Sequence, residues 1–374
     1  MCMASEKKTL NCPRLDWNSK LEDFPLENFP DYEPGKPPRF EKLAEISHLA
    51  EYEKLWGRPC GEQGIGRLRE VALVRPNEYE MDPLFLKNPE FFLMRHMMLT
   101  KTQMDIRRVQ ENFDRYVDIL KGEGVKVNVL DHETYPVMGV YGPLRKLFVA
   151  ARLGFVVNGG VIIKRWGHSS WSRGLEYYAQ QFFTKLNVPI LLFVSGKGIF
   201  EDAWVWAAEN VLIGSYGIAC NQEAMEQLNP VLKAAGVEQV VMGNSTSILD
   251  SFESGGDFHT DICLGVADLG LAVVYPAQLD WNVYTWLRQN HFKLLEIPAD
   301  EQVKCLPANG VLIEPGRIIM SSAAKKTNAM LRKEGVDVIE MDTDGLAHGG
   351  VNGIRCCTCR IYREPGPRLE EIKR

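Results

Sequence analysis

The sequence predicts an α/β fold in which five repeated units stack around a central axis as a five-bladed α/β propeller. Two observations lead to this prediction. An amphipathic helix, a Gly or Asn break and a short apolar strand recur five times along the chain. Pairs of short apolar runs stand between these recurrences. A single unit of this kind cannot bury its faces alone, whereas five units in a ring can.

The helix–strand recurrences follow one plan from residue 109 onward. A run of helical periodicity ends at a Gly or Asn, and four to six mostly apolar residues follow it. We expect the helices to lie outside and the strands inside the ring. The recurrences cover residues 109–129, 177–192, 223–241, 282–295 and 327–339.

Paired apolar runs joined by tight turns come between the helices, with Gly, Asn or Asp in each turn. A doubly wound parallel sheet is the alternative architecture. It would place a helix between successive strands, so strand pairs without a helix argue against it. The pairs are 153–157 with 161–164, 203–207 with 211–214, 262–266 with 271–275, and 310–313 with 316–320.

The first 60 residues differ from the rest, because they contain seven of the 20 prolines and few long apolar runs. We expect a proline-rich arm over residues 1–60 and a single α/β-propeller catalytic domain over residues 61–374. The role of the arm stays open.

Composition excludes several classes of function. The net charge is −6 and the sequence contains no basic stripe, so nucleic acid is not an expected partner. No apolar run reaches the length that crosses a bilayer, and the first 30 residues lack a signal-peptide core, so we expect a cytoplasmic protein. Nine cysteines, an odd number, suit free thiols in a reducing compartment. Whether the protein forms a homodimer stays open.

The chemistry is expected where the inner strands begin, because these ends converge on the axis. Two acids, Glu201 and Asp202, open one strand, and His259 and Asp261 open another after two glycines. If residues 354–362 form a strand, Cys356 and Thr358 share one face and Cys357 and Cys359 the other. A thiol, a histidine and a carboxylate together indicate nucleophilic catalysis. The cysteine spacing is a poor match to a metal site.

These segments together resemble the guanidino-group-modifying enzymes, the penteins, which comprise arginine deiminases, dimethylargininases and glycine amidinotransferases. The resemblance covers about residues 60–364. The motifs that carry it are the glycine-rich turn with Cys356-x-Thr358, His259-x-Asp261, Phe200-Glu201, the strand at 68–76, and the turns at 165–167 and 172–174.

The resemblance implies a role for each matching residue. Cys356 is the nucleophile, His259 is the general acid and base, and Glu201 holds His259 or the substrate guanidinium. Asp261 binds the planar guanidinium by paired hydrogen bonds, and Arg173 contacts substrate. A covalent thiouronium-type intermediate is then resolved by water or by an amine. This chemistry requires no cofactor or metal.

Two departures from the family pattern bear on the substrate. Arg152 lies where an acid is usual, and it would repel a guanidinium and favour a substrate carboxylate. The second departure is the Glu201–Trp204 segment, which replaces the acid-Gly-Gly-Asp sequence of the family. There Asp202 could compensate for the missing acid, and Trp204 could narrow the pocket or stack on a planar cation.

Three functions therefore stay open. The first hypothesis is a hydrolase of a guanidino or amidino C–N bond, which the strand at 272–276 favours. The second is an amidinotransferase, which residues 171–177 and the Cys-x-Thr-Cys ending favour. The third is a non-catalytic pentein that binds a partner, which the missing acid near Arg152 favours.

Overall fold

A computed structural model of the chain describes residues 18–23, 25, 27, 32–37, 47–51, 58–75, 106–130, 154–165, 175–201, 203–245, 259–343 and 353–372. The chain divides into two compact units, Met1–Glu51 and Tyr52–Arg374. In the first unit, a short 3-10 helix covers Leu21–Asp23. All the elements below belong to the second unit.

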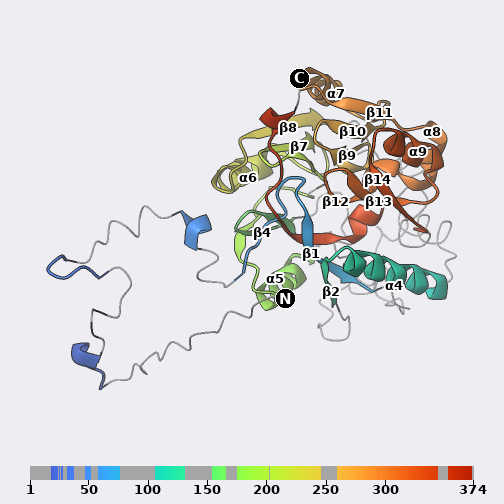
Figure 1. Cartoon of the computed structure of the whole chain (residues 1–374). Coiled ribbons are helices and arrows are strands. Elements are labelled where there is room, and N and C mark those ends of the chain that lie inside the picture. The colour runs from blue at the N-terminus through green and yellow to red at the C-terminus, as the bar shows by residue number, and fades with distance from the viewer. Residues whose placement is uncertain are drawn as a thin grey trace, which may run out of the picture. The chain divides into compact units, whose positions relative to one another are not determined.

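The described strands of the second unit form five three-stranded sheets with one common topology (Figure 1). In each sheet the first two strands are antiparallel and the third is parallel to the second. The predicted five-bladed α/β propeller of strand–strand–helix–strand units is confirmed. The sheets are β15 (Cys359–Arg363), β1 (Leu68–Val74) and β2 (Lys126–Leu130); β3 (Phe155–Val157), β4 (Gly160–Ile163) and β5 (Ile190–Phe193); β6 (Val205–Ala208), β7 (Val211–Tyr216) and β8 (Gln239–Asn244); β9 (Leu264–Asp268), β10 (Leu271–Val274) and β11 (Lys293–Glu296); and β12 (Val311–Glu314), β13 (Arg317–Ser321) and β14 (Asp337–Met341).

A helix crosses from the second to the third strand of every sheet, because parallel neighbours need such a crossover. Figure 1 shows α4, α5, α6 and α7 at the periphery of the strands. The crossover helices are α4 (Ile106–Gly122), α5 (Leu175–Lys185), α6 (Gln222–Ala234), α7 (Trp281–Gln289) and α9 (Lys325–Lys333). A further short helix, α8 (Ala299–Cys305), precedes β12.

The sequence of α6 shows why these segments are helical. The Asn221 side chain caps its start by accepting a hydrogen bond from the backbone of Ala224 at 3.1 Å. Met225, Leu228 and Leu232 recur on one face and are buried in the core. The chain leaves the helix through Gly236, whose φ of +92° lies in the region that favours glycine.

The ring is closed by its two distant ends, because β15 pairs antiparallel with β1. The sequence interpretation assigned the Cys356 segment to the fifth unit. It instead precedes the first strand of the sheet that contains β1 and β2. The opening strands of neighbouring sheets contact one another, as β6 with β9, β9 with β12 and β15 with β3 do. They therefore surround a common centre.

No helix in the described ranges is both long and apolar enough to cross a bilayer. The largest core cluster joins side chains of several sheets, and Phe155, Phe200, Trp204 and Trp206 form an aromatic group within it. This packing fixes the strand ends that carry the polar residues described below.

We predict that Ile361→Ala in β15 lowers the free energy of unfolding by about 2–5 kcal/mol, because the side chain is fully buried where the ring closes. The matched control is Ile190→Ala in β5, whose side chain is 36% exposed. The Ile190→Ala substitution should lower the free energy of unfolding by much less. Denaturant unfolding of both variants checks this, and equal losses would contradict the role of β15 in closure.

Candidate active site

Three short 3-10 turns precede three of the opening strands and carry the polar side chains of the site. They are η8 (Thr260–Ile262) before β9, η9 (Pro307–Asn309) before β12, and η10 (Ile354–Cys357) before β15. These turns supply Asp261, Asn309 and Cys356, respectively. Residues from three sheets thus meet at one end of the ring.

The backbone at Cys356 differs from the predicted strand, which begins only at Cys359. Cys356 N–H donates to the Gly353 carbonyl at 3.1 Å, and the Thr358 hydroxyl donates to the Ile354 carbonyl at 2.8 Å. These local bonds favour a 3-10 turn over a strand. Cys356 is half-exposed while Thr358 is fully buried, so the predicted shared face of these two residues is wrong.

The His259-x-Asp261 segment is likewise not a strand. His259 is extended, with φ −116° and ψ 126°, and it caps the 3-10 turn that contains Asp261. The Asp261 backbone N–H donates to the Ala203 carbonyl at 3.1 Å, which ties this turn to the opening of β6. The two side chains of the motif therefore have separate partners.

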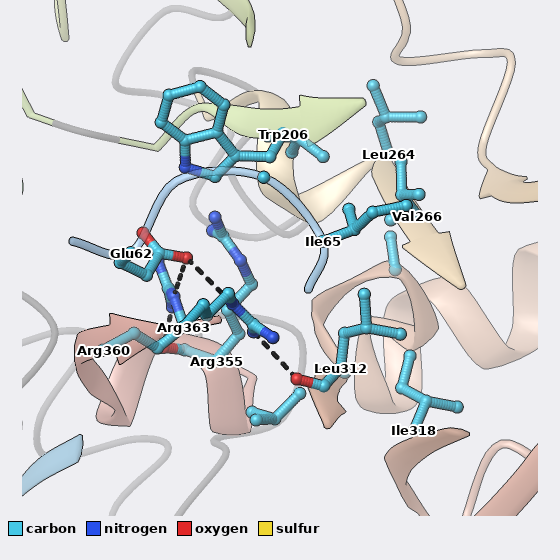
Figure 2. Close-up of a pocket in the computed structure, with 16 residues that line it drawn as sticks. Glu62, Ile65, Trp206, Leu264, Val266, Leu312, Ile318, Arg355, Arg360 and Arg363 are labelled. Atoms are coloured by element: carbon cyan, nitrogen blue, oxygen red, sulfur yellow. Dashed lines mark hydrogen bonds and ion pairs between the residues drawn. The ribbon is translucent and has the colours of Figure 1, made fainter. Parts of the chain in front are cut away.

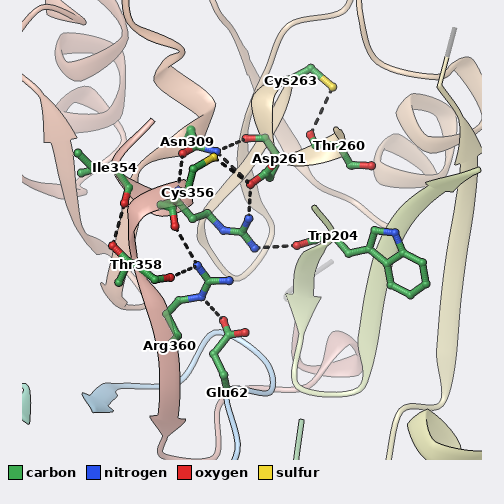
Figure 3. Close-up of polar contacts among 11 residues, drawn as sticks. Glu62, Trp204, Thr260, Asp261, Cys263, Asn309, Ile354, Cys356, Thr358 and Arg360 are labelled. Carbon is green, nitrogen blue, oxygen red and sulfur yellow. Dashed lines mark hydrogen bonds and ion pairs between the residues drawn. The ribbon is translucent and has the colours of Figure 1, made fainter. Parts of the chain in front are cut away.

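Asp261 is buried and faces the turns that hold Asn309 and Cys356 (Figure 3). The Asn309 side-chain amide donates to Oδ2 of Asp261 at 3.0 Å and to its carbonyl at 3.1 Å. The Asn309 oxygen accepts from the Cys356 backbone N–H at 3.1 Å. Sγ of Cys356 lies 4.0 Å from Oδ2 of Asp261. A Cβ on Gly353 would meet Asn309 at 2.3 Å, so the turn requires glycine there.

His259 pairs with Glu201, which the resemblance implied would hold either His259 or the substrate guanidinium. Nε2 of His259 lies 3.3 Å from Oε2 of Glu201, whose side chain has no exposed surface. The backbone of Glu201 is held by a bond to the Ala219 carbonyl at 2.9 Å, next to the bridges that Phe200 makes. A buried carboxylate at this distance holds the imidazole in a fixed orientation.

Arg355, next to the candidate nucleophile, forms an ion pair with Asp261. One guanidinium nitrogen donates to Oδ2 of Asp261 at 2.5 Å, and the other donates to the Trp204 carbonyl at 2.7 Å. Burial alone would raise the pKa of Asp261. The charges of Arg355 and His259 outweigh burial and hold the pKa below its ordinary value. Asp261 is therefore a carboxylate at neutral pH.

A second buried ion pair, between Arg360 and Glu62, lies next to the Cys356 turn. Nε of Arg360 donates to Glu62 at 2.6 Å, and another nitrogen of Arg360 donates to the Thr358 carbonyl at 3.3 Å. Figure 2 shows Glu62 with Arg360, Arg363 and Arg355 at a cavity of about 40 Å³. Burial lowers the pKa of Arg363 to about 10, yet the group stays charged at neutral pH.

The structure changes the expectation for one predicted substrate residue. The ring of Trp204 is 2% exposed and packs edge-on against Phe200, with ring centroids 5.0 Å apart. Figure 3 shows this ring directed away from Asp261. Trp204 contributes its carbonyl to Arg355, and its ring is not available to stack on a cation. Asp202, Arg152 and Arg173 lie outside the described residues.

Sequence reasoning missed Asn309, Arg355 and Glu62. Asn309 stands at the start of a strand in the same way as Asp261, and a uniform search of all strand starts would have found it. Arg355 lies directly before Cys356 in the sequence but carried no assigned role. Glu62 had no local signal, since its partner Arg360 is far away in the chain.

Comparison with known proteins gives a relative along nearly the whole chain. The 2-nitroimidazole nitrohydrolase of Mycobacterium sp. (strain JS330) is 31% identical over 365 residues, which cover 94% of this chain and 95% of that protein. The family model for arginine deiminase matches residues 267–363.

Solved structures share the fold at lower identity. Pseudomonas aeruginosa dimethylarginine dimethylaminohydrolase, as a mutant complexed with citrulline, is 15% identical with a TM-score of 0.57, covering 79% of this chain and 99% of that one. The N-terminal domain of the cyanobacterial arginine dihydrolase ArgZ, bound to product, is 17% identical with a TM-score of 0.59, covering 79% and 98%. The amidinotransferase SxtG of Microseira wollei is 14% identical with a TM-score of 0.58, covering 83% and 99%.

The other cysteines allow a test of thiol reactivity. Burial raises the pKa of Cys60 and Cys220 to about 12 and that of Cys305 to about 11. At pH 8 their thiolate fractions are thus about 10⁻³ or less. We predict that iodoacetamide labels native Cys356 at pH 8 at least about 100-fold faster than these three thiols.

Peptide mapping after timed quenching measures these rates. Unfolding the protein in guanidinium should bring all four rates close together, which controls for access and peptide recovery. Labelling of Cys305 as fast as Cys356 in the native protein would contradict the prediction.

Proposed function

This chain belongs to the superfamily of guanidino-group-modifying enzymes and is a hydrolase acting on C–N bonds, and we propose that Cys356, His259 and Glu201 carry its reaction. Cys356 serves as the nucleophile, His259 as the general acid and base, and Glu201 as the group that orients His259. Asp261 binds an N–H of the substrate.

The convergence of these groups at the openings of three strands is the observation that supports the proposal best. Glu201 and His259 form a buried pair at 3.3 Å, and Asp261 lies two residues from His259 and 4.0 Å from the Cys356 sulfur. A nucleophile, a base with its orienting acid, and a buried substrate acceptor are the parts that covalent catalysis requires.

The reaction proceeds in two steps. The Cys356 thiolate adds to the electron-poor carbon between two nitrogens, and the carbon–leaving-group bond breaks with its electron pair passing to the leaving group. His259 supplies a proton where the leaving group requires one. In the second step His259 takes a proton from water, which attacks the same carbon and releases the thiolate.

The nitrohydrolase relative suggests what this carbon belongs to. Its name gives 2-nitroimidazole as substrate, in which the nitro-bearing carbon lies between two ring nitrogens. All four bonds of that carbon go to nitrogen, as they do in a guanidine carbon, and its bond to the nitro group is a C–N bond. We propose an amidine-type carbon, in an open or a ring compound, as the centre that Cys356 attacks.

We predict that Cys356→Ser lowers kcat by about 10³-fold or more, because a hydroxyl at this position is a far weaker nucleophile than a thiolate. Cys357→Ser and Cys359→Ser are the matched controls and should keep most of the activity. Steady-state kinetics on 2-nitroimidazole and on a panel of small guanidines and amidines measures this. Near-wild-type turnover by Cys356→Ser would contradict the proposed role.

Product analysis separates hydrolysis from amidino transfer. We expect the leaving group to be released at an unchanged rate with and without an added amine such as glycine, because water resolves the intermediate. Strict dependence of product formation on the amine would instead make the protein a transferase with the same covalent step.

A further inference from the structure

The two oxygens of the Asp261 carboxylate have different surroundings. Oδ2 accepts from Arg355 at 2.5 Å and from Asn309 at 3.0 Å. Oδ1 is buried and has no hydrogen-bond partner among the described residues. A buried carboxylate oxygen without a donor is costly, so it marks a place where a ligand N–H is expected.

The charge of Asp261 is already matched before any substrate binds. Arg355 provides the opposite charge, and the Trp204 carbonyl at 2.7 Å fixes the guanidinium in place from its other side. The side chains of Arg355 and Asp261 are only 13% and 5% exposed, so solvent screens this pair weakly. The chain's own guanidinium therefore takes the oxygen that a substrate guanidinium would need.

A cationic substrate fits these surroundings poorly. Paired recognition of a guanidinium uses both carboxylate oxygens, and Oδ2 is occupied. A second cation at Asp261 would also lie beside Arg355, and like charges in contact disfavour binding. An uncharged molecule that offers a single N–H to Oδ1 meets neither obstacle.

The position of Arg355 also suits an anionic leaving group. Arg355 and the Cys356 sulfur both lie within 4.0 Å of the same Oδ2 atom. By balancing the negative charge of Asp261, the guanidinium removes a repulsion that would oppose both the thiolate and an anion that departs from the attacked carbon. The Arg355 charge therefore favours both the formation of the Sγ–C bond and the loss of the leaving group with its electron pair.

We propose that the substrate is an uncharged amidine-type compound, such as an electron-poor azole, which donates one N–H to Oδ1 of Asp261, and that Arg355 is the residue that selects it over guanidinium cations. This inference rests on the proposed function, because it assigns the substrate class of the same site.

Binding to the full-length chain carrying Cys356→Ala tests the inference without any chemistry. The probes are 2-nitroimidazole, its 1-methyl derivative and methylguanidinium. Titration calorimetry measures their binding at a pH below the pKa of the azole N–H, where 2-nitroimidazole is uncharged and keeps this proton. We expect 2-nitroimidazole to bind about fivefold or more tightly than the methylated probe, because the latter lacks the N–H. Methylguanidinium should bind more weakly than either azole.

Arg355→Gln should change this order in the same background. Removing the positive charge leaves Asp261 unmatched, so methylguanidinium should gain at least about tenfold in affinity relative to 2-nitroimidazole. Arg355→Lys keeps the charge and should stay near the original ratio. Arg67→Gln removes an arginine from a half-exposed ion pair with Glu314 and serves as the matched control, with no expected change.

Three outcomes would overturn the inference: tighter binding of methylguanidinium than of 2-nitroimidazole before Arg355 is changed, equal binding of the methylated probe, or an unchanged ratio in Arg355→Gln. The probe comparison needs no change at Arg355, so it stands even if Arg355→Gln does not fold. Turnover that survives Cys356→Ser would instead refute the proposed function and leave the binding order intact.

Discussion

The pairing of the C-terminal strand β15 with β1 is the constraint on which the site depends. This pairing closes the ring and brings the turn before β15 next to the turns before β9 and β12. Cys356 thereby reaches Asp261, although 95 residues separate them in the chain. The loop closure that this pairing requires is offset by burial along β15, where Ile361 is fully covered.

Buried charge gives the site its chemical character. Among the described residues, three buried carboxylates of the site are paired: Glu62 with Arg360, Asp261 with Arg355, and Glu201 with His259. Burying such charges costs several kcal/mol each unless they are paired and hydrogen-bonded. The Arg355 charge helps to keep Asp261 ionised, and the three pairs orient the turn, the imidazole and the acceptor oxygen. The remaining acceptor, Oδ1 of Asp261, is directed to the substrate in our proposal.

Repeated periodicity let the sequence predict the propeller, because helix, glycine break and strand recur with local signals that need no tertiary information. The polar residues at the predicted strand starts, together with the family resemblance, selected Cys356, His259, Glu201 and Asp261, which the structure places at the openings of three strands. The strand at Cys356 was wrong, since the hydrogen bonds of a 3-10 turn outweighed the alternation of side chains. Arg355 and Asn309 act through partners in distant segments, and the buried ring of Trp204 reflects packing against Phe200. Such contacts depend on the closed ring, and local pattern does not reveal them.

The central claim is that the Cys356 thiolate forms a covalent bond with an uncharged amidine-type carbon. Acid-quenched single turnover of the wild-type chain with 2-nitroimidazole, followed by intact-mass measurement and peptide mapping, tests it most directly. We expect a transient mass increase equal to the substrate without its leaving group, located on Cys356 in the 353–360 segment. A transient adduct on Cys357, Cys359 or any other residue would contradict the account.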